Sequence, residues 1–126
     1  MSHYIFVWKE VSVRINAKEF GEVCLLEIDG EVDAEHAPQL KRAIAKARED
    51  FARHFILDMS GVTFIDSTGL GVLISLMRHL NENSGKLKLA GLQDEVRSIF
   101  EITRLYKVFE LCPNAEEALR DIQKKK

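Results

Sequence analysis

The stretch FILDMSGVTFIDSTGLGVLISLMRHL, residues 55–80, decides the fold, because its hydrophobic pattern changes midway from that of a strand to that of a helix. It starts with FILDMS, a short apolar run typical of a strand that is covered on both faces. After Ser67, apolar side chains recur at helical spacing, at Leu70, Leu73, Met77 and Leu80. A strand followed directly by a helix is the repeating unit of an α/β protein.

The segments on either side of this unit continue the alternation. Three segments rich in β-branched, aromatic and aliphatic residues come first: YIFVWK (4–9), VSVRIN (11–16) and EVCLLEI (22–28). A helix is predicted over 33–51, with Asp33 as its N-cap and Pro38 near its start. Later segments indicate strand, helix, strand and helix, at 86–91, 93–105, 107–112 and 114–123.

This order predicts the α/β class and a single domain over residues 1–126. The N-terminal strands are expected to pair antiparallel through a short turn around Glu19 to Gly21. The later strands are expected to lie parallel, because each pair is joined by a helix. The result is a mixed β-sheet with about four helices packed on it. The apolar segment 1–9 is predicted to add an extra edge strand, and its use in a homodimer stays open.

Composition limits the function classes. The chain has 126 residues, of which 46% are hydrophobic and 30% are charged, as in one soluble globular domain. The net charge of −2 comes from 18 basic and 20 acidic residues of interspersed sign, which argues against direct binding of nucleic acid. The basic block 124–126 is interpreted as a solvated tail. The longest uncharged run, 67–77, is too short to cross a bilayer, so we expect no membrane insertion and a cytoplasmic protein.

The motif DSTGLG, residues 66–71, is the main candidate site. Asp66, Ser67 and Thr68 place a carboxylate and two hydroxyls where a helix has its free N–H groups. A helix start needs no function to explain such residues. Gly69 and Gly71, however, each cost roughly 1 kcal/mol in a helix interior, which favours a close approach by a partner or a phosphate. If so, Gly69→Ala should leave the domain as stable as before, or stabilise it, while weakening binding.

Catalytic and metal-binding interpretations are poorly supported. Ile65 stands where a G-x-S-x-G nucleophile elbow needs its first glycine, and no acid lies between Ser67 and His79. The third glycine of a dinucleotide fingerprint is missing. Cys24 and Cys112 are far apart without a C-x-x-C pattern, which predicts two buried thiols. We therefore expect no enzyme activity, no cofactor and no metal.

Three segments together resemble the STAS-domain anti-sigma-factor antagonists of bacteria: EIDGEVDAEHAPQLKRAI (27–44), the stretch 55–80, and KLKLAGLQDEVRSIFEITRLYKVFEL (86–111). The resemblance extends from about Val11 to Ile122. Its most specific elements are the D-S-[ST]-G-L-G run and the upstream G-E-[LV]-D. It implies a single STAS-like domain.

The resemblance also implies a partner switch. Such antagonists bind an anti-sigma factor that is also a serine kinase of the histidine-kinase-like ATPase type, and thereby release the sigma factor. Phosphorylation of the serine after the motif's aspartate ends the interaction, and a serine phosphatase restores it. On this chain the phosphoacceptor would be Ser67. The partner-binding residues would be Asp33, Asp66, Ser67, Thr68, Gly69, Leu70 and Gly71.

A second interpretation stays open beside this one. The same domain resembles free-standing subunits of lipid-transport and stressosome-type assemblies. In such a subunit the motif would serve only as a helix start.

Overall fold

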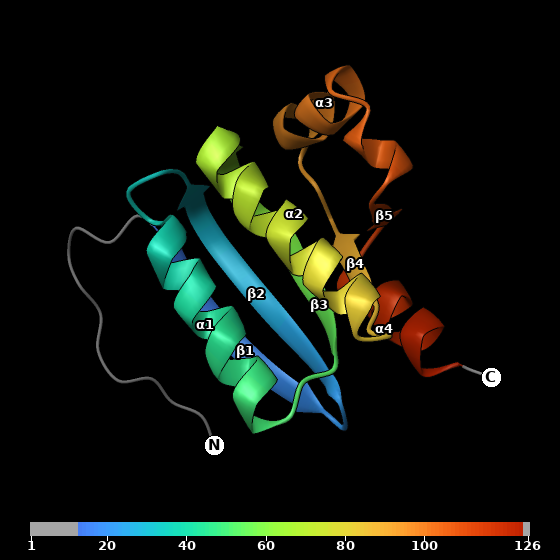
Figure 1. Ribbon diagram of the computed structural model, residues 1–126. Helices are drawn as coiled ribbons and strands as arrows, with labels where there is room; N and C mark the ends of the chain where they lie inside the picture. The colour runs from blue at the N-terminus through green and yellow to red at the C-terminus, as the bar shows by residue number, and fades with distance from the viewer. Residues whose placement is uncertain (1–12, 125–126) are drawn as a thin grey trace.

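The computed structural model describes residues 13–124, which form one sheet and the helices packed on it (Figure 1). The strands are β1 (Val13–Phe20), β2 (Val23–Val32), β3 (His54–Ile65), β4 (Leu87–Ala90) and β5 (Glu110–Cys112). The helices are α1 (Ala37–Asp50), α2 (Ser67–Glu82), α3 (Asp94–Ile102) and α4 (Ala115–Gln123), with a short 3₁₀ helix, η1 (Leu105–Lys107), before β5. The predicted strand over 1–9 and the last two residues of the basic tail lie outside the described residues.

The sheet has five strands in the order β1-β2-β3-β4-β5. β1 and β2 pair antiparallel, and β2, β3, β4 and β5 pair parallel. The predicted mixed α/β sheet is confirmed. Because each parallel pair needs a crossover, a helix follows β2 and β3, and α3 with η1 connects β4 to β5.

The β1–β2 hairpin turns one residue later than the sequence pattern suggested. Phe20 pairs with Val23, which leaves Gly21 and Glu22 as the two turn residues. Gly21 has φ +61°, a value that two-residue hairpin turns require and that glycine adopts without strain. β1 consequently continues to Phe20, four residues beyond the strand predicted over 11–16.

The two faces of the sheet are covered unequally. The main core lies between the sheet and α1, α2 and α3, and its largest fully buried side chains include Phe55, Leu26, Leu40, Leu73 and Phe100. Figure 1 shows α1 and α2 side by side in front of β2 and β3. A smaller cluster on the other face packs α4 on the sheet, through Val23, Leu25, Ile56, Ala90, Ala118 and Ile122. β3 is therefore covered on both faces along its first half, as its apolar run predicted.

Helix α1 begins later than predicted, and Asp33 is not its N-cap. The helix starts at Ala37, with His36 at the N-cap position and Pro38 second in the helix. Asp33 instead closes a turn, because its backbone carbonyl accepts hydrogen bonds from the N–H groups of His36 (3.1 Å) and Ala37 (2.8 Å). This turn leads the chain from the end of β2 into the helix.

Two further expectations are corrected by local geometry. The strand predicted over 107–112 is reduced to Glu110–Cys112. Arg104 has φ +64° and leads into η1, and the N–H groups of Val108 and Phe109 bond the carbonyl of Leu105 instead of joining the sheet. Of the two thiols predicted to be buried, Cys24 is buried, which raises its pKa to about 12, but Cys112 is only half-buried.

Candidate functional site

The DSTGLG motif lies where β3 ends and α2 begins. β3 ends at Ile65, α2 begins at Ser67, and Asp66 between them has an extended backbone. Asp66 Oδ1 accepts a hydrogen bond from the N–H of Gly69 at 2.9 Å, and its carbonyl accepts from the N–H of Leu70 at 2.9 Å. Asp66 is thus the N-cap of α2, and its carboxylate satisfies a donor that the first turn leaves free.

The second carboxylate oxygen of Asp66 serves a different purpose. Oδ2 accepts a hydrogen bond from the N–H of Ala34 at 3.0 Å, and the N–H of Asp66 donates to the carbonyl of Val32 at 3.3 Å. Asp66 therefore caps α2 and also holds the loop between β2 and α1 against the start of α2 by a hydrogen bond. The sequence predicted Asp66 as a neighbour of the expected phosphoacceptor Ser67, but nothing in the pattern indicated this hydrogen bond between residues 32 positions apart.

Ser67 and Thr68 are the first two residues of α2, and both are exposed. At these positions their backbone N–H groups have no carbonyl one turn earlier in the helix to bond. The positive end of the helix dipole lies here as well, which favours a negative charge. The geometry can therefore present a hydroxyl to another molecule and accommodate a phosphate on it.

The two glycines of the motif have different environments. Gly69 is buried, and a Cβ at this position would lie 2.3 Å from the carbonyl oxygen of Val32. Gly71 is exposed, and a Cβ there would meet nothing within 4 Å. The expectation that Gly69→Ala is tolerated is wrong, because the methyl group would clash with the backbone of β2. Gly69 lets α2 pack closely on the end of β2, and only Gly71 leaves open space for a partner.

Leu70 and Asp33 complete the predicted set. Leu70 is half-buried and packs against the main core, so only part of it is accessible to a partner. Asp33 Oδ1 accepts a hydrogen bond from the N–H of His36 at 3.0 Å and lies 2.6 Å from His36 Nδ1. The hydrogen bond from the His36 side chain lowers the pKa of Asp33. Since the next residue, Ala34, is bonded to Asp66, the structure brings the Asp33 loop to the start of α2.

Other polar clusters lie away from this edge of the sheet. His79 contacts the Arg48 guanidinium and Asn83 at the C-terminal end of α2, and these residues line a hollow between the ends of α1 and α2. Within residues 13–124, no group of three or more His, Cys, Asp or Glu side chains could hold a metal ion. In the same range, no helix combines the length and apolar character needed to cross a membrane.

Sequence reasoning missed Phe64, which is 47% exposed at the end of β3. The sequence pattern predicted a strand covered on both faces only for FILDMS, residues 55–60, and made no prediction of burial or exposure for Phe64. Its neighbour Ile65 is only 2% exposed. The only signal for Phe64 was its position two residues before Asp66, which is too weak to separate an exposed side chain from a buried one.

Comparison with known proteins identifies the family. The STAS domain model matches residues 14–118. This chain belongs to the STAS-domain family of anti-sigma-factor antagonists. It is 32% identical over 80 residues to the anti-sigma-B factor antagonist of Staphylococcus aureus, covering 64% of this chain and 74% of that protein.

Two further relatives extend the similarity over most of the chain. The anti-sigma-B factor antagonist of Listeria monocytogenes is 31% identical over 101 residues, covering 80% of this chain and 88% of that protein. The crystal structure of an anti-sigma factor antagonist from Mycobacterium paratuberculosis superposes with a TM-score of 0.80 at 26% identity, covering 90% of this chain and 96% of that chain. The whole STAS fold is therefore shared.

Proposed function

We propose that this STAS protein is an anti-sigma-factor antagonist that acts in the cytoplasm through partner switching. In its unphosphorylated form it binds an anti-sigma factor that is also a serine kinase of the histidine-kinase-like ATPase type, and the bound sigma factor is released. Phosphorylation of Ser67 ends the binding, and a serine phosphatase restores it. The observation that carries the proposal is the exposed Ser67 at the first position of α2, in a chain whose relatives are named anti-sigma-B factor antagonists.

The surroundings of Ser67 explain how one phosphate could act as a switch. A phosphate adds about −1.5 to −2 charges at pH 7, and the N-terminus of α2 can accommodate them, so the fold should survive. A partner docked on this edge would meet that charge together with Asp33, Asp66 and the exposed Glu31 and Glu35. Forcing a phosphate into such a contact costs on the order of 2–5 kcal/mol, or roughly 30-fold to several-thousand-fold in affinity.

The test is phosphorylation of the purified chain by the anti-sigma serine kinases of the source organism, with ATP. Intact mass before and after phosphatase treatment measures the modification. We expect one phosphate on the wild-type chain and on Thr68→Ala, and none on Ser67→Ala. Stoichiometric phosphorylation of Ser67→Ala would contradict the choice of hydroxyl.

Binding measurements complete the test. Calorimetric titration should give the unphosphorylated chain the higher affinity for the kinase, with phosphorylation weakening it at least about 30-fold. Ser67→Asp should weaken binding less than a phosphate does, because it carries one negative charge and fewer acceptor atoms. Equal affinity of the two phosphorylation states would overturn the switch.

A further inference from the structure

We propose that Phe64 is the apolar anchor of the partner-binding surface, and that the partner receives it in an apolar socket rimmed by basic side chains. The inference rests on the proposed function, because the occupant to which it commits is the anti-sigma factor of that proposal. It adds a residue that lies outside the DSTGLG motif, on the strand before it.

The first observation is the exposure of a large aromatic side chain at this edge of the sheet. Phe64 is 47% exposed, whereas Val62 and Ile65 on the same strand are 0% and 2% exposed. Burying a phenyl ring in a partner is among the largest single contributions an interface side chain makes. Phe64 lies three residues before Ser67, so a partner that reaches Ser67 is close enough to cover it.

The second observation is the local geometry that turns Phe64 outward. Along the β2–β3 pair, Gly30 pairs with Val62 but the next residue, Glu31, pairs with Phe64. Thr63 is therefore an extra residue on β3, which makes this a β-bulge. Bulges often occur beside functional sites, where they redirect a side chain. Because consecutive strand residues point to opposite faces and Ile65 belongs to the main core, Phe64 points away from α1 and α2.

The third observation is the charge around the ring. Glu31 at the end of β2, and Asp33 and Glu35 in the loop that follows, are acidic, and no lysine or arginine lies within residues 30–36. Glu31 stands opposite Phe64 in the sheet, and both Glu31 and Glu35 are exposed. An apolar centre with a charged rim is the usual arrangement of a binding hot spot. Charge complementarity then requires basic side chains around the partner's socket.

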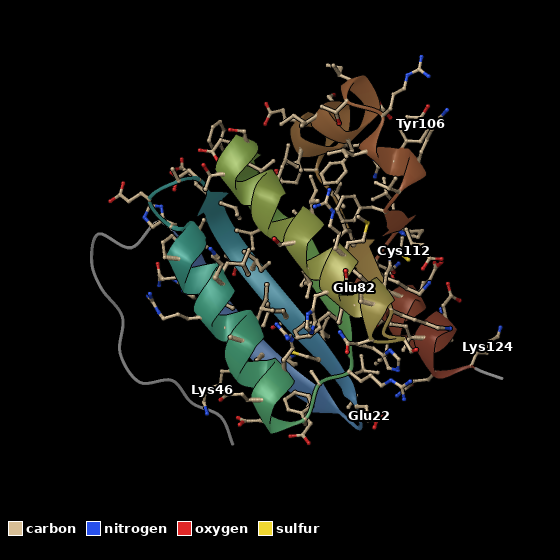
Figure 2. All side chains as sticks on the ribbon, in the orientation of Figure 1. Glu22, Lys46, Glu82, Tyr106, Cys112 and Lys124 are labelled. Carbon is tan, nitrogen blue, oxygen red and sulfur yellow. The ribbon has the colours of Figure 1, made fainter. Side chains whose placement is uncertain are left out.

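A second exposed aromatic residue provides a matched control. Tyr106 in η1 is 45% exposed, close to the 47% of Phe64. η1 leads into β5, which is the edge strand opposite β1, and Figure 2 shows Tyr106 on the α3 and β5 side of the molecule. Loss of Tyr106 removes a similar exposed ring from a surface that the proposal does not use.

The experiment is calorimetric titration of wild type, Phe64→Ala, Tyr106→Ala and Ser67→Asp with the purified anti-sigma serine kinases of the source organism. ADP replaces ATP, so that Ser67 stays unphosphorylated. We expect Phe64→Ala to weaken binding by about 30-fold, as removal of a hot-spot side chain does, and Tyr106→Ala by less than about threefold. Phe64→Thr, which keeps a β-branched residue in the strand, should weaken binding as Phe64→Ala does if the alanine variant folds poorly.

The possible results separate the two proposals. If Ser67→Asp weakens binding but neither Phe64 variant does, the role of Phe64 is overturned and the proposed function still stands. No binding of wild type to any of these kinases overturns both proposals. A wild-type dimer in sedimentation that Phe64→Ala converts to a monomer, with kinase affinity unchanged, overturns the proposal by assigning the ring to a second copy of the chain.

Discussion

At the start of α2, the side that packs on the sheet (the inner side) and the side that faces solvent (the outer side) have different roles. On the inner side, Asp66 bonds Gly69 and Ala34, and Gly69 packs against the carbonyl of Val32. On the outer side, Ser67, Thr68 and Gly71 are exposed. Within the six residues of the DSTGLG motif, some therefore hold the helix on the sheet and others face solvent. Because helical residues rotate by about 100° each, neighbours in a motif need not share a role.

Gly69→Ala should give the largest effect and is the strongest test of the inner side. The added methyl group would lie 2.3 Å from the Val32 carbonyl oxygen, and a backbone atom cannot rotate away as a side chain can. We expect the free energy of unfolding to fall by about 2–3 kcal/mol, after the gain in helix propensity is included. Urea denaturation measures it. An unchanged midpoint would show that α2 can shift to accept the methyl group, and the distinction between the two sides would weaken.

Asp66→Ala should have the next largest effect on the free energy of unfolding. It removes the N-cap bond to Gly69 and the bond to Ala34, so we expect a loss of about 2 kcal/mol in urea denaturation. The control is Thr68→Ala on the outer side, which should change stability by less than about 0.5 kcal/mol. Equal losses in the two variants would contradict the assignment of Asp66 to the fold.

Gly71→Ala should act in the opposite direction to Gly69→Ala. Its Cβ would enter open space, so alanine should stabilise the domain by up to roughly 1 kcal/mol through helix propensity. Kinase affinity, measured by calorimetry on the same samples, should fall if Gly71 lies under the partner. Greater stability with unchanged affinity would confine the partner to Ser67, Thr68 and the loop beside them.

The pH dependence of the Asp33–His36 contact should be the smallest effect. The hydrogen bond from His36 lowers the pKa of Asp33 below its ordinary 3.8, so the contact stabilises the fold above that pH. The stabilisation is lost as the pH falls through the lowered folded-state value. His36→Gln should raise the pKa of Asp33 toward 3.8 in an NMR titration. The gap in thermal midpoint between wild type and this variant should narrow at acid pH. If the pKa of Asp33 in the wild-type protein were not lowered, the hydrogen bond from His36 would be contradicted.

The fold was predictable from sequence to the extent that local patterns carried it. Alternating and helical hydrophobic spacing predicted the mixed sheet, and each described strand and α-helix has a counterpart in that prediction, whereas the 3₁₀ helix η1 has none. The errors lie at ends of elements. Asp33 has the residue type of an N-cap, but its turn is set by the bond between Ala34 and Asp66, which joins residues 32 positions apart. The strand before α4 is short because Arg104 adopts a left-handed conformation, which a single arginine does not signal.

The sequence was enough to predict where in the chain the candidate site lies, but not how its side chains are arranged. The sequence by itself determined that residues 66–71 start a helix after a buried strand, because N-cap residue types and hydrophobic periodicity are local properties. Only the tertiary structure decided which residues face inward. The close approach of α2 to Val32 buries Gly69, and the β-bulge at Thr63 exposes Phe64. The burial of Gly69 and the exposure of Phe64 both depend on the position of β2 in the fold. Contacts between segments far apart in the chain produce no hydrophobic periodicity in either segment, so the sequence pattern does not reveal them.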